Sequence, residues 1–431
     1  MIKNGLQVFN GKRLLMLQGP MGPFFRRLSR DFEKAGAEVY KINFNGGDCL
    51  FYPCDSLLFR GSLDEWPAFL ESTLDQYQVD IVFLFGDCRP VHRIVKEIAT
   101  RRGIKTGVFE EGYVRPDYIT LELYGANGHS RLPRDPAFYL TQPISAISPT
   151  KPVGRAAYWY MALWAVLYYI ASAALKPIFP HYQHHRPLTL QEAFPWIRGA
   201  FRKYYYRIKE RGIEEKLVGR CNGKYFLVPL QVHNDAQIEV HSDFDSARVF
   251  IEKVVDSFRK HAPHDTILVV KHHPLDRGYV DYTDLIDQLI RKYGLQKKLL
   301  YIHDQHLPAL LEHAQGVVVI NSTVGLSALD QGKPLKVLGS ALYNLNGLTF
   351  QGTLDEFWNQ APTHQLDRNL FYRFRRYLIA QTQLNGGYYK RLDSTESGAG
   401  LIWEGSDTNC AAKKTVSEYG ADRDNQVTIK K

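Results

Sequence analysis

Short apolar runs alternate with longer amphipathic stretches through most of this chain, and no other feature constrains the fold as strongly. In the first half, the predicted strands are Leu14–Leu17, Val39–Phe44, Ile81–Phe85 and Thr106–Phe109. The predicted helices between them are Phe24–Ala35, Glu65–Tyr77 and Pro90–Arg102. Strands that alternate with helices are typical of a parallel α/β domain. The first half therefore predicts one Rossmann-like unit.

The second half repeats this alternation. Its predicted strands are Tyr225–Leu230, Thr266–Val270, Leu299–Ile302, Val317–Ile320 and Leu335–Leu338. Its predicted helices are Asp245–His261, Tyr282–Tyr293, Pro308–His313 and Val324–Gln331. Two facing α/β units place a ligand cleft outside the carboxyl ends of both sheets. We therefore expect an α/β fold of two Rossmann-like domains around a central cleft.

A third kind of composition separates the two units. Ala156–Leu175 is uncharged and as long as the roughly 20 residues that cross a bilayer. It is rich in Tyr and Trp, which prefer the membrane interface, and the basic aromatic run Trp196–Arg211 follows it. The segment could be an interfacial helix, a buried interdomain helix or a membrane span. A single span would put the two α/β units on opposite sides of the membrane, so we expect an interfacial helix.

These patterns predict four segments. Residues 1–150 form the first domain, 151–219 a membrane-associating helical segment, 220–393 the second domain, and 394–431 a polar, disordered tail.

Cysteine content and charge narrow the setting. The five cysteines among 431 residues are scattered without CxxC spacing, which argues against a disulfide framework or a zinc site and favours a reducing compartment. The first residues show no secretory signal, so we expect a cytoplasmic protein. The net charge of +9 predicts an anionic partner. No nucleic-acid-binding motif accompanies the charge, which argues against nucleic acid.

In the first domain, three predicted strand ends carry candidate residues. Glu110 and Glu111 end one strand, and since neighbouring residues of a strand point to opposite sides, only one carboxylate can face the cleft. It could act as nucleophile or general base, or be an ordinary solvated acid. Two further loops converge on the same edge, and they supply Gln18, Gly19, Gly22, Asp87 and Arg89.

In the second domain, the strongest signal is Lys271-His272-His273 at the end of a predicted strand, which is typical of an anion site. Asn321-Ser322-Thr323 follows another strand and precedes a helix, where Ser322 or Thr323 can cap the helix. Taken singly, these could be ordinary loop and capping residues. Asp243 and Asp245 resemble a DxD metal site but are better placed to cap the next helix, so we expect no metal and no cofactor.

Ten segments then carry a family resemblance, in the same order along most of the chain. They are Leu14–Phe25, Phe44–Asp48, Phe85–Pro90, Glu110–Thr120, Leu132–Tyr139, Leu230–Ile238, Lys271–Gly278, Ile320–Leu329, Lys333–Gly339 and Gly347–Gly352. The chain resembles the KpsS-type capsule polysaccharide proteins. Members are similar to GT-B-type retaining β-Kdo transferases, which use CMP-Kdo and attach Kdo to a phosphatidylglycerol-type lipid, starting a linker for capsule export.

The resemblance implies roles for individual residues. His272, His273, Ser322 and Thr323 would bind CMP, and Glu111 would be the catalytic carboxylate beside Glu110. The donor site also includes Lys271, Asn321 and Gln231, and Arg115 belongs to the acceptor side.

The expected partners are a CMP-sugar donor, an anionic phospholipid acceptor, the inner-membrane surface to which the protein is peripherally attached, and other capsule assembly and export proteins. Two alternatives to a transferase stay open. One is a non-catalytic export or scaffold component, and the other is a sugar-nucleotide epimerase of the same architecture.

Overall fold

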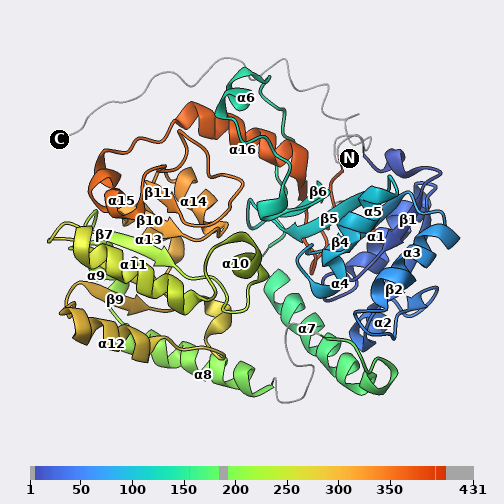
Figure 1. Ribbon diagram of the computed structural model, residues 1–431, viewed down its shortest axis with the longest axis horizontal. Coiled ribbons are helices and arrows are strands. Elements are labelled where there is room, and N and C mark those ends of the chain that lie inside the picture. The colour runs from blue at the N-terminus through green and yellow to red at the C-terminus, as the bar shows by residue number, and fades with distance from the viewer. Residues whose placement is uncertain (1–4, 155, 184–192, 394, 404–431) are drawn as a thin grey trace.

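The computed structural model describes residues 5–154, 156–183, 193–393 and 395–403. Two α/β domains lie side by side, the first at the right of Figure 1 and the second at the left. Every predicted strand and helix is present, with ends that differ by a few residues, except that the predicted helix Pro90–Arg102 is divided at Ile94 into two helices.

The first domain is built on five parallel strands: β1 (Arg13–Met16), β2 (Glu38–Asn43), β3 (Leu57–Leu58), β4 (Ile81–Phe85) and β5 (Lys105–Glu111). Their spatial order, β3-β2-β1-β4-β5, is that of a Rossmann sheet. The covering helices are α1 (Phe24–Lys34), α2 (Gly46–Phe51), α3 (Trp66–Gln76), α4 (Pro90–Arg93) and α5 (Val95–Arg101). Alternate residues enter opposite layers, since Leu14 and Met16 join one core and Leu15 and Leu17 the other.

The second domain repeats this order. Its parallel strands are β7 (Tyr225–Pro229), β8 (Ile267–Lys271), β9 (Leu299–Ile302), β10 (Gly316–Val319) and β11 (Leu335–Val337), arranged β9-β8-β7-β10-β11. The helices are α9 (Ile213–Val218), α10 (Ala236–His241), α11 (Ala247–His261), α12 (Thr283–Tyr293), α13 (Leu307–His313), α14 (Val324–Asp330) and α15 (Leu354–Gln360). The expectation of two Rossmann-like, GT-B-like domains is confirmed by these matching topologies.

The first sheet contains three strands that were not predicted: the parallel edge strand β3 and two antiparallel strands. β6 (Tyr118–Leu123) pairs with β5, and β12 (Gln383–Asn385) pairs with β6. The short helices η3 (Asn127–His129) and α6 (Pro136–Thr141) follow β6. After the second domain, α16 (Arg368–Thr382) returns the chain to the first sheet, as the top of Figure 1 shows. The last strand of the second sheet, β11, thus ends at Val337, well before residue 393, where the second domain was predicted to end. The later strand β12 belongs to the first sheet.

Residues after β12 also pack on the first domain. Ala399, Leu401 and Trp403 are buried in the same core as Phe9 and Phe32. The expectation of a disordered tail from residue 394 is therefore wrong for residues 395–403, because three apolar side chains find a buried site there. Residues 404–431 lie outside the described part.

The segment between the domains forms α7 (Ala157–Ala174), the short η4 (Lys176–Ile178) and α8 (Ala193–Lys209). α7 lies under the first domain and α8 beside α12 of the second (Figure 1). Among the described residues, no helix is both long enough and apolar enough to cross a membrane.

Candidate functional site

Each domain has one point where the strand order reverses, and polar residues bridge both points. In the first sheet the reversal lies between β1 and β4, where Arg89 donates to Gln18 Oε1 at 3.0 Å. In the second it lies between β7 and β10, where Gln231 donates to Asn321 Oδ1 at 2.9 Å. Open α/β sheets bind ligands at such points, so these four residues mark the two halves of a candidate site.

The two carboxylates at the end of β5 have different neighbours. Glu110 lies among Arg89, Asp87 and Cys88, and burial, followed by the repulsion of Glu111, raises its pKa from 4.5 to about 7. The Glu111 side chain lies beside the hydroxyl of Tyr389. Of the two, Glu110 is the carboxylate beside Cys88, which itself contacts the second domain.

The basic strand end of β8 is more buried than its sequence suggests. Lys271 is buried and donates to the carbonyl of His303 at 2.8 Å, and burial lowers its pKa to about 8. His272 is buried, shares a hydrogen bond with Tyr301 at 2.7 Å, and has a pKa lowered by burial to about 3. His273 is half-buried and accepts from the N–H of Leu275. Of the three, His273 is the most open to a ligand.

The polar turn after β10 forms as predicted. Ser322 Oγ accepts from the N–H of Val324 at 3.3 Å, while Thr323 stands at the N-cap of α14 without a side-chain cap bond. Asn321 donates to the carbonyls of Gln237 and His241, which fixes its amide beside Gln231. The expectation that Asp243 or Asp245 caps the next helix is wrong, because Ser246 is the N-cap of α11.

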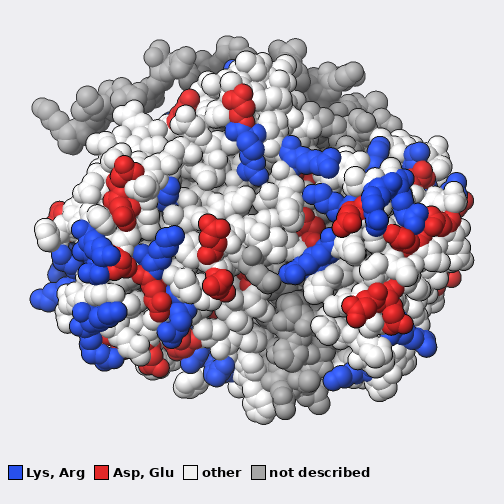
Figure 2. All heavy atoms as spheres, viewed as in Figure 1, with Lys and Arg blue, Asp and Glu red and all other residues white. Residues whose placement is uncertain are grey.

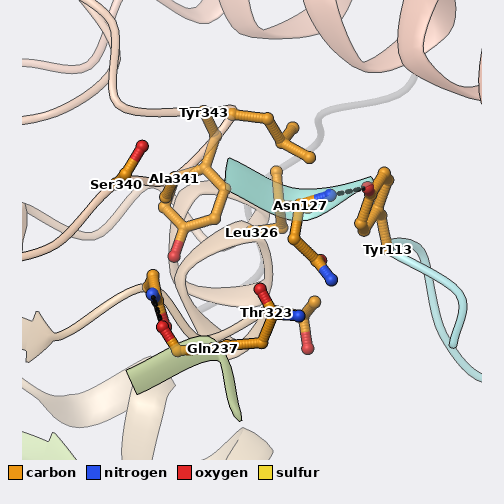
Figure 3. A pocket seen from close by; sticks show the side chains of 10 residues that line it. Tyr113, Asn127, Gln237, Thr323, Leu326, Ser340, Ala341 and Tyr343 are labelled. Carbon is orange, nitrogen blue, oxygen red and sulfur yellow. Dashed lines mark hydrogen bonds between the residues drawn. The ribbon is translucent and has the colours of Figure 1, made fainter. Parts of the chain in front are cut away.

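A pocket between the domains collects several of these residues. Tyr113 and Asn127 line it from the first domain, and Asn321 and Thr323 from the second. Figure 3 shows the side chains converging from both sides, with the Asn127 N–H donating to the Tyr113 hydroxyl. Of the lining residues, only Asn321 and Thr323 were predicted from the sequence. Tyr113 and Asn127 were not, nor were Gln237, Leu326, Ser340, Ala341, Leu342 and Tyr343.

The glycine turn after β1 contacts protein rather than open space. A Cβ on Gly19 would lie 2.8 Å from the Phe25 ring, and one on Gly22 would lie 3.1 Å from Trp164 of α7. Gln18 is buried and donates to Tyr168 of α7 at 3.2 Å. This turn therefore holds α7 against the first domain.

The expected acceptor-side residues are not all brought together. Asp87 Oδ2 accepts from His129 Nδ1 at 2.9 Å and from the Ala126 N–H. Arg115 is exposed and donates to the carbonyl of Gly112 at 3.1 Å. Asp87 and Arg89 thus lie at the interdomain edge, while Arg115 lies on an exposed turn.

Polar and glycine contacts also dock α7. A Cβ on Gly46 would meet the carbonyl of Ala171, and one on Gly47 would meet the Tyr168 ring. The buried Tyr168 donates to Asp48 at 3.0 Å. The Phe44–Asp48 segment is therefore the docking site of α7.

α8 docks on the second domain in a similar way. Gly278 lies against Pro195 and Gly199, and Arg198 donates to its carbonyl. Arg202 forms an ion pair with Asp281 at 3.1 Å, so part of the basic cluster binds the domain itself.

The outer faces of both helices stay apolar and exposed. The α7 face includes Trp159, Leu163, Val166 and Ile170, and the α8 face includes Phe194, Ile197, Phe201, Tyr204 and Ile208. The spacing of three or four residues makes each set one stripe of its helix. The alternative of a buried interdomain helix is wrong for α7, because Trp159 is 75% exposed.

Comparison with known proteins supplies the family. A family described as "Capsule polysaccharide biosynthesis protein" matches residues 80–389. The "Capsule polysaccharide export protein KpsS" of Escherichia coli is 42% identical over 399 residues, covering 90% of this chain and 99% of that relative. The "Capsule polysaccharide modification protein LipB" of Neisseria meningitidis serogroup B is 42% identical over 402 residues, covering 91% and 95%. The chain belongs to the capsule polysaccharide biosynthesis family.

Among solved structures, "Thermosulfurimonas dismutans KpsC, beta Kdo 2,4 transferase" is 14% identical with a TM-score of 0.36, covering 78% of this chain and 87% of that one. Overlap at this level supports no statement about shared chemistry. The KpsS-type resemblance of the ten segments agrees with the family match.

For this capsule family member, the structure adds two polar clusters that the sequence analysis missed. Glu122 is buried, accepts from Tyr113 and Ser130, and has a pKa raised by burial to about 7. Cys88 lies 3.7 Å from His241 of the second domain, close to His129. Residues far apart in sequence form both clusters, so no local spacing could have revealed them.

Proposed function

We propose that this capsule polysaccharide biosynthesis protein is a glycosyltransferase that moves β-Kdo from CMP-Kdo to a phosphatidylglycerol or lysophosphatidylglycerol acceptor, with retention at the anomeric carbon. The product would start the lipid-linked Kdo chain needed for capsule export. One observation carries the proposal: two Rossmann-like domains share a pocket, and Asn321 and Thr323, which follow the strand β10 at the reversal point of the second sheet, line it.

The second domain is assigned the donor. Asn321, Gln231 and His273 follow three strands in the order β10-β7-β8. Neighbouring strands are about 4.8 Å apart, so the ends of β10 and β8 are separated by about 10 Å. Such a row offers hydrogen bonds over the length of a nucleoside monophosphate. Ser322 and Thr323 extend it, and we assign no metal to the donor phosphate.

The first domain is assigned the chemistry. Transfer breaks the bond between the anomeric carbon and the phosphate oxygen of CMP, and forms a bond to an acceptor hydroxyl oxygen that loses its proton. A carboxyl with a pKa near the working pH suits proton transfer, and Glu110 has that property. Glu111, the catalytic carboxylate by resemblance, is the second candidate at the same strand end.

The helices α7 and α8 are assigned to the lipid surface. Their exposed stripes would enter the interface, and the exposed cations Lys203 and Arg207 of α8 would meet anionic headgroups. On the face shown in Figure 2, positive and negative side chains are interspersed over both domains. Attraction to an anionic surface would therefore depend on α8 more than on the charge of that face. We propose that this attachment is peripheral and lies at the cytoplasmic side of the inner membrane.

Mass spectrometry of the lipid after incubation with purified protein and CMP-Kdo tests the proposal. We expect one Kdo residue on lysophosphatidylglycerol and release of CMP. An unchanged lipid with an altered free donor would instead favour an epimerase. An unchanged lipid and an intact donor would favour a non-catalytic export or scaffold component. Either result would overturn the transferase proposal.

A further inference from the structure

Three side chains with metal-binding atoms meet where the two domains touch. Cys88 follows β4, His129 ends η3, and His241 ends α10. One ligand atom from each lies within 4.8 Å of the others, and Cys88 Sγ lies 3.7 Å from His241 Nε2. Tetrahedral zinc, with Zn–S near 2.3 Å and Zn–N near 2.0 Å, separates sulfur and nitrogen ligands by about 3.5 Å. The distance between Cys88 and His241 is close to that value, and the pairs with His129, which lie within 4.8 Å, would contract toward it on binding the ion.

The surroundings of the cluster orient it for a metal. Asp87 holds His129 Nδ1 at 2.9 Å, so the other ring nitrogen of His129 is directed to a different partner. A carboxylate behind a ligating histidine is the usual arrangement in zinc sites. Gln237 Nε2 lies 3.8 Å from Cys88 Sγ, which suits an N–H donor to a thiolate. The nearby carboxylates of Asp87 and Glu110 add negative potential for a cation.

Two of the three ligands are buried, and the third is partly exposed to solvent. Cys88 and His241 are 4% and 7% exposed, whereas the His129 side chain is 39% exposed. A thiolate with two imidazoles suits zinc and disfavours Mg²⁺ and Ca²⁺, which prefer oxygen. Three protein ligands leave a fourth position for water.

We propose that Cys88, His129 and His241 form a zinc site that ties the two domains together. Two ligands belong to the first domain and one to the second, so the ion binds best when the domains are closed. Bound metal thereby stabilises the closed arrangement over an open one. None of the three ligands is a proposed donor residue, although the His241 carbonyl accepts from Asn321, and metal binding can be measured without the proposed transfer reaction.

Cobalt titration of the full-length, metal-stripped protein tests the site, because tetrahedral Co²⁺ reports a thiolate ligand by its charge-transfer absorption. We expect one Co²⁺ per chain with that band, and displacement by Zn²⁺. Cys88→Ser should lose the band, and His241→Ala should weaken binding at least tenfold. Cys49→Ser, in α2, is the matched control and should keep both. Absence of the band in wild type, or its persistence in Cys88→Ser, overturns the proposal.

Two further measurements keep the test decisive. Circular dichroism of the metal-stripped variants checks folding. If Cys88→Ser fails to fold, Asp87→Asn is tested instead, and we expect it to lose Co²⁺ affinity by about 10-fold to 100-fold. Unchanged Co²⁺ affinity in Asp87→Asn would contradict the site. Small-angle scattering tests the tie: Zn²⁺ should reduce the radius of gyration of wild type and leave His241→Ala unchanged. Stoichiometric Zn²⁺ binding without a change in wild type would overturn the domain-bridging role.

Discussion

Glu110 and Glu111 are adjacent in β5, yet their side chains lie in different surroundings. Glu110 packs beside Arg89 and Cys88 at the interdomain edge, and Glu111 beside Tyr389. The alternation of side chains along a strand is the cause. Their contributions to the proposed reaction can therefore be separated by substitution.

Glu110→Gln and Glu111→Gln each keep the shape of the side chain and remove its charge. We expect Kdo transfer to fall by at least a hundredfold in the variant that loses the reacting carboxylate, while CMP binding persists. The loss of general acid or base catalysis alone costs about 10²–10⁴-fold. Transfer rates and CMP titrations with both variants are the measurement. Near wild-type turnover in both would remove β5 from the mechanism.

Stability should respond to pH through Glu110. Its folded pKa, raised from 4.5 to about 7, means that the folded protein loses stability as the pH rises from about 4.5 through 7. Glu110→Gln cannot ionise and escapes this loss. We expect the variant to match wild type at pH 4 and to be more stable by roughly 1–3 kcal/mol at pH 8. Urea unfolding of both proteins at pH 4 and pH 8 measures this difference in stability. The same difference between variant and wild type at both pH values would contradict the prediction.

The neighbouring histidines of β8 should also differ. His272 is buried and bonded to Tyr301, so His272→Ala should lower the free energy of unfolding by about 1–3 kcal/mol. His273 is half-buried, so His273→Ala should weaken CMP binding with little effect on stability. Calorimetric CMP titration and thermal unfolding of both variants test this contrast. Unchanged CMP affinity in His273→Ala would remove that residue from the donor site.

Among the helices, α7 and α8 differ in sequence but pack on the protein in the same way. Each buries one face on its own domain through glycine contacts, at Gly46 and Gly47 for α7 and at Gly278 for α8. Each leaves an apolar stripe exposed. An isolated apolar helix face on this scale is typical of an interaction surface.

Polar substitutions in the stripes test their role. Leu163→Gln with Ile170→Gln in α7, and Ile197→Gln with Phe201→Gln in α8, should each lower binding to phosphatidylglycerol vesicles at least tenfold. Full burial of one such side chain contributes about 1.5–3 kcal/mol. Tyr372→Gln, which is 50% exposed on α16, is the matched control. Vesicle sedimentation measures binding, and wild-type affinity in both double variants would contradict the assignment.

The elements also show what apolar periodicity can and cannot predict. Most strands of the two Rossmann sheets were predictable because each contains a run of apolar residues, such as Ile81–Phe85. β3 was missed because its two residues are too few to form such a run. β6 and β12 were missed, because one mixes polar and apolar residues and the other has three residues whose partner is distant in sequence. Pairing, rather than local pattern, defines such strands.

At the scale of the whole molecule, the chain closes on itself. α16 carries it from the second domain back to β12, and Trp403 then packs against Phe9 and Phe32 near the beginning of the chain. The core of the first domain thus contains residues from both ends of the described chain, and we expect both ends to stabilise it.

Trp403→Ala tests that expectation. The side chain is 2% exposed, and loss of a buried tryptophan costs about 3–5 kcal/mol. We expect the unfolding transition of the first domain to shift to a lower denaturant concentration. Fluorescence, or hydrogen exchange of β1 and β5, measures that transition. Tyr372→Gln again serves as the exposed control. A transition at the wild-type denaturant concentration would mean that the C-terminal residues do not stabilise this core.

The candidate site was predictable only in part for a related reason. Strand ends give Glu110, Asn321 and His273 their places, since the carboxyl edge of a parallel sheet follows from the order of the elements. The pocket residue Tyr343 and the Cys88 cluster depend on how the two domains meet. That geometry is carried by contacts between side chains distant in sequence, and no repeat or spacing encodes it.

The docking of α7 and α8 on different domains has a consequence for attachment to a surface. Two weak contacts joined through one folded body act as a bivalent ligand, so the second contact forms at a high effective concentration after the first. Overall affinity then exceeds that of either stripe, but only for domain angles that let both touch the same plane. A flat bilayer would thus select among orientations of the two domains, and removing one stripe would abolish this selection as well as the avidity.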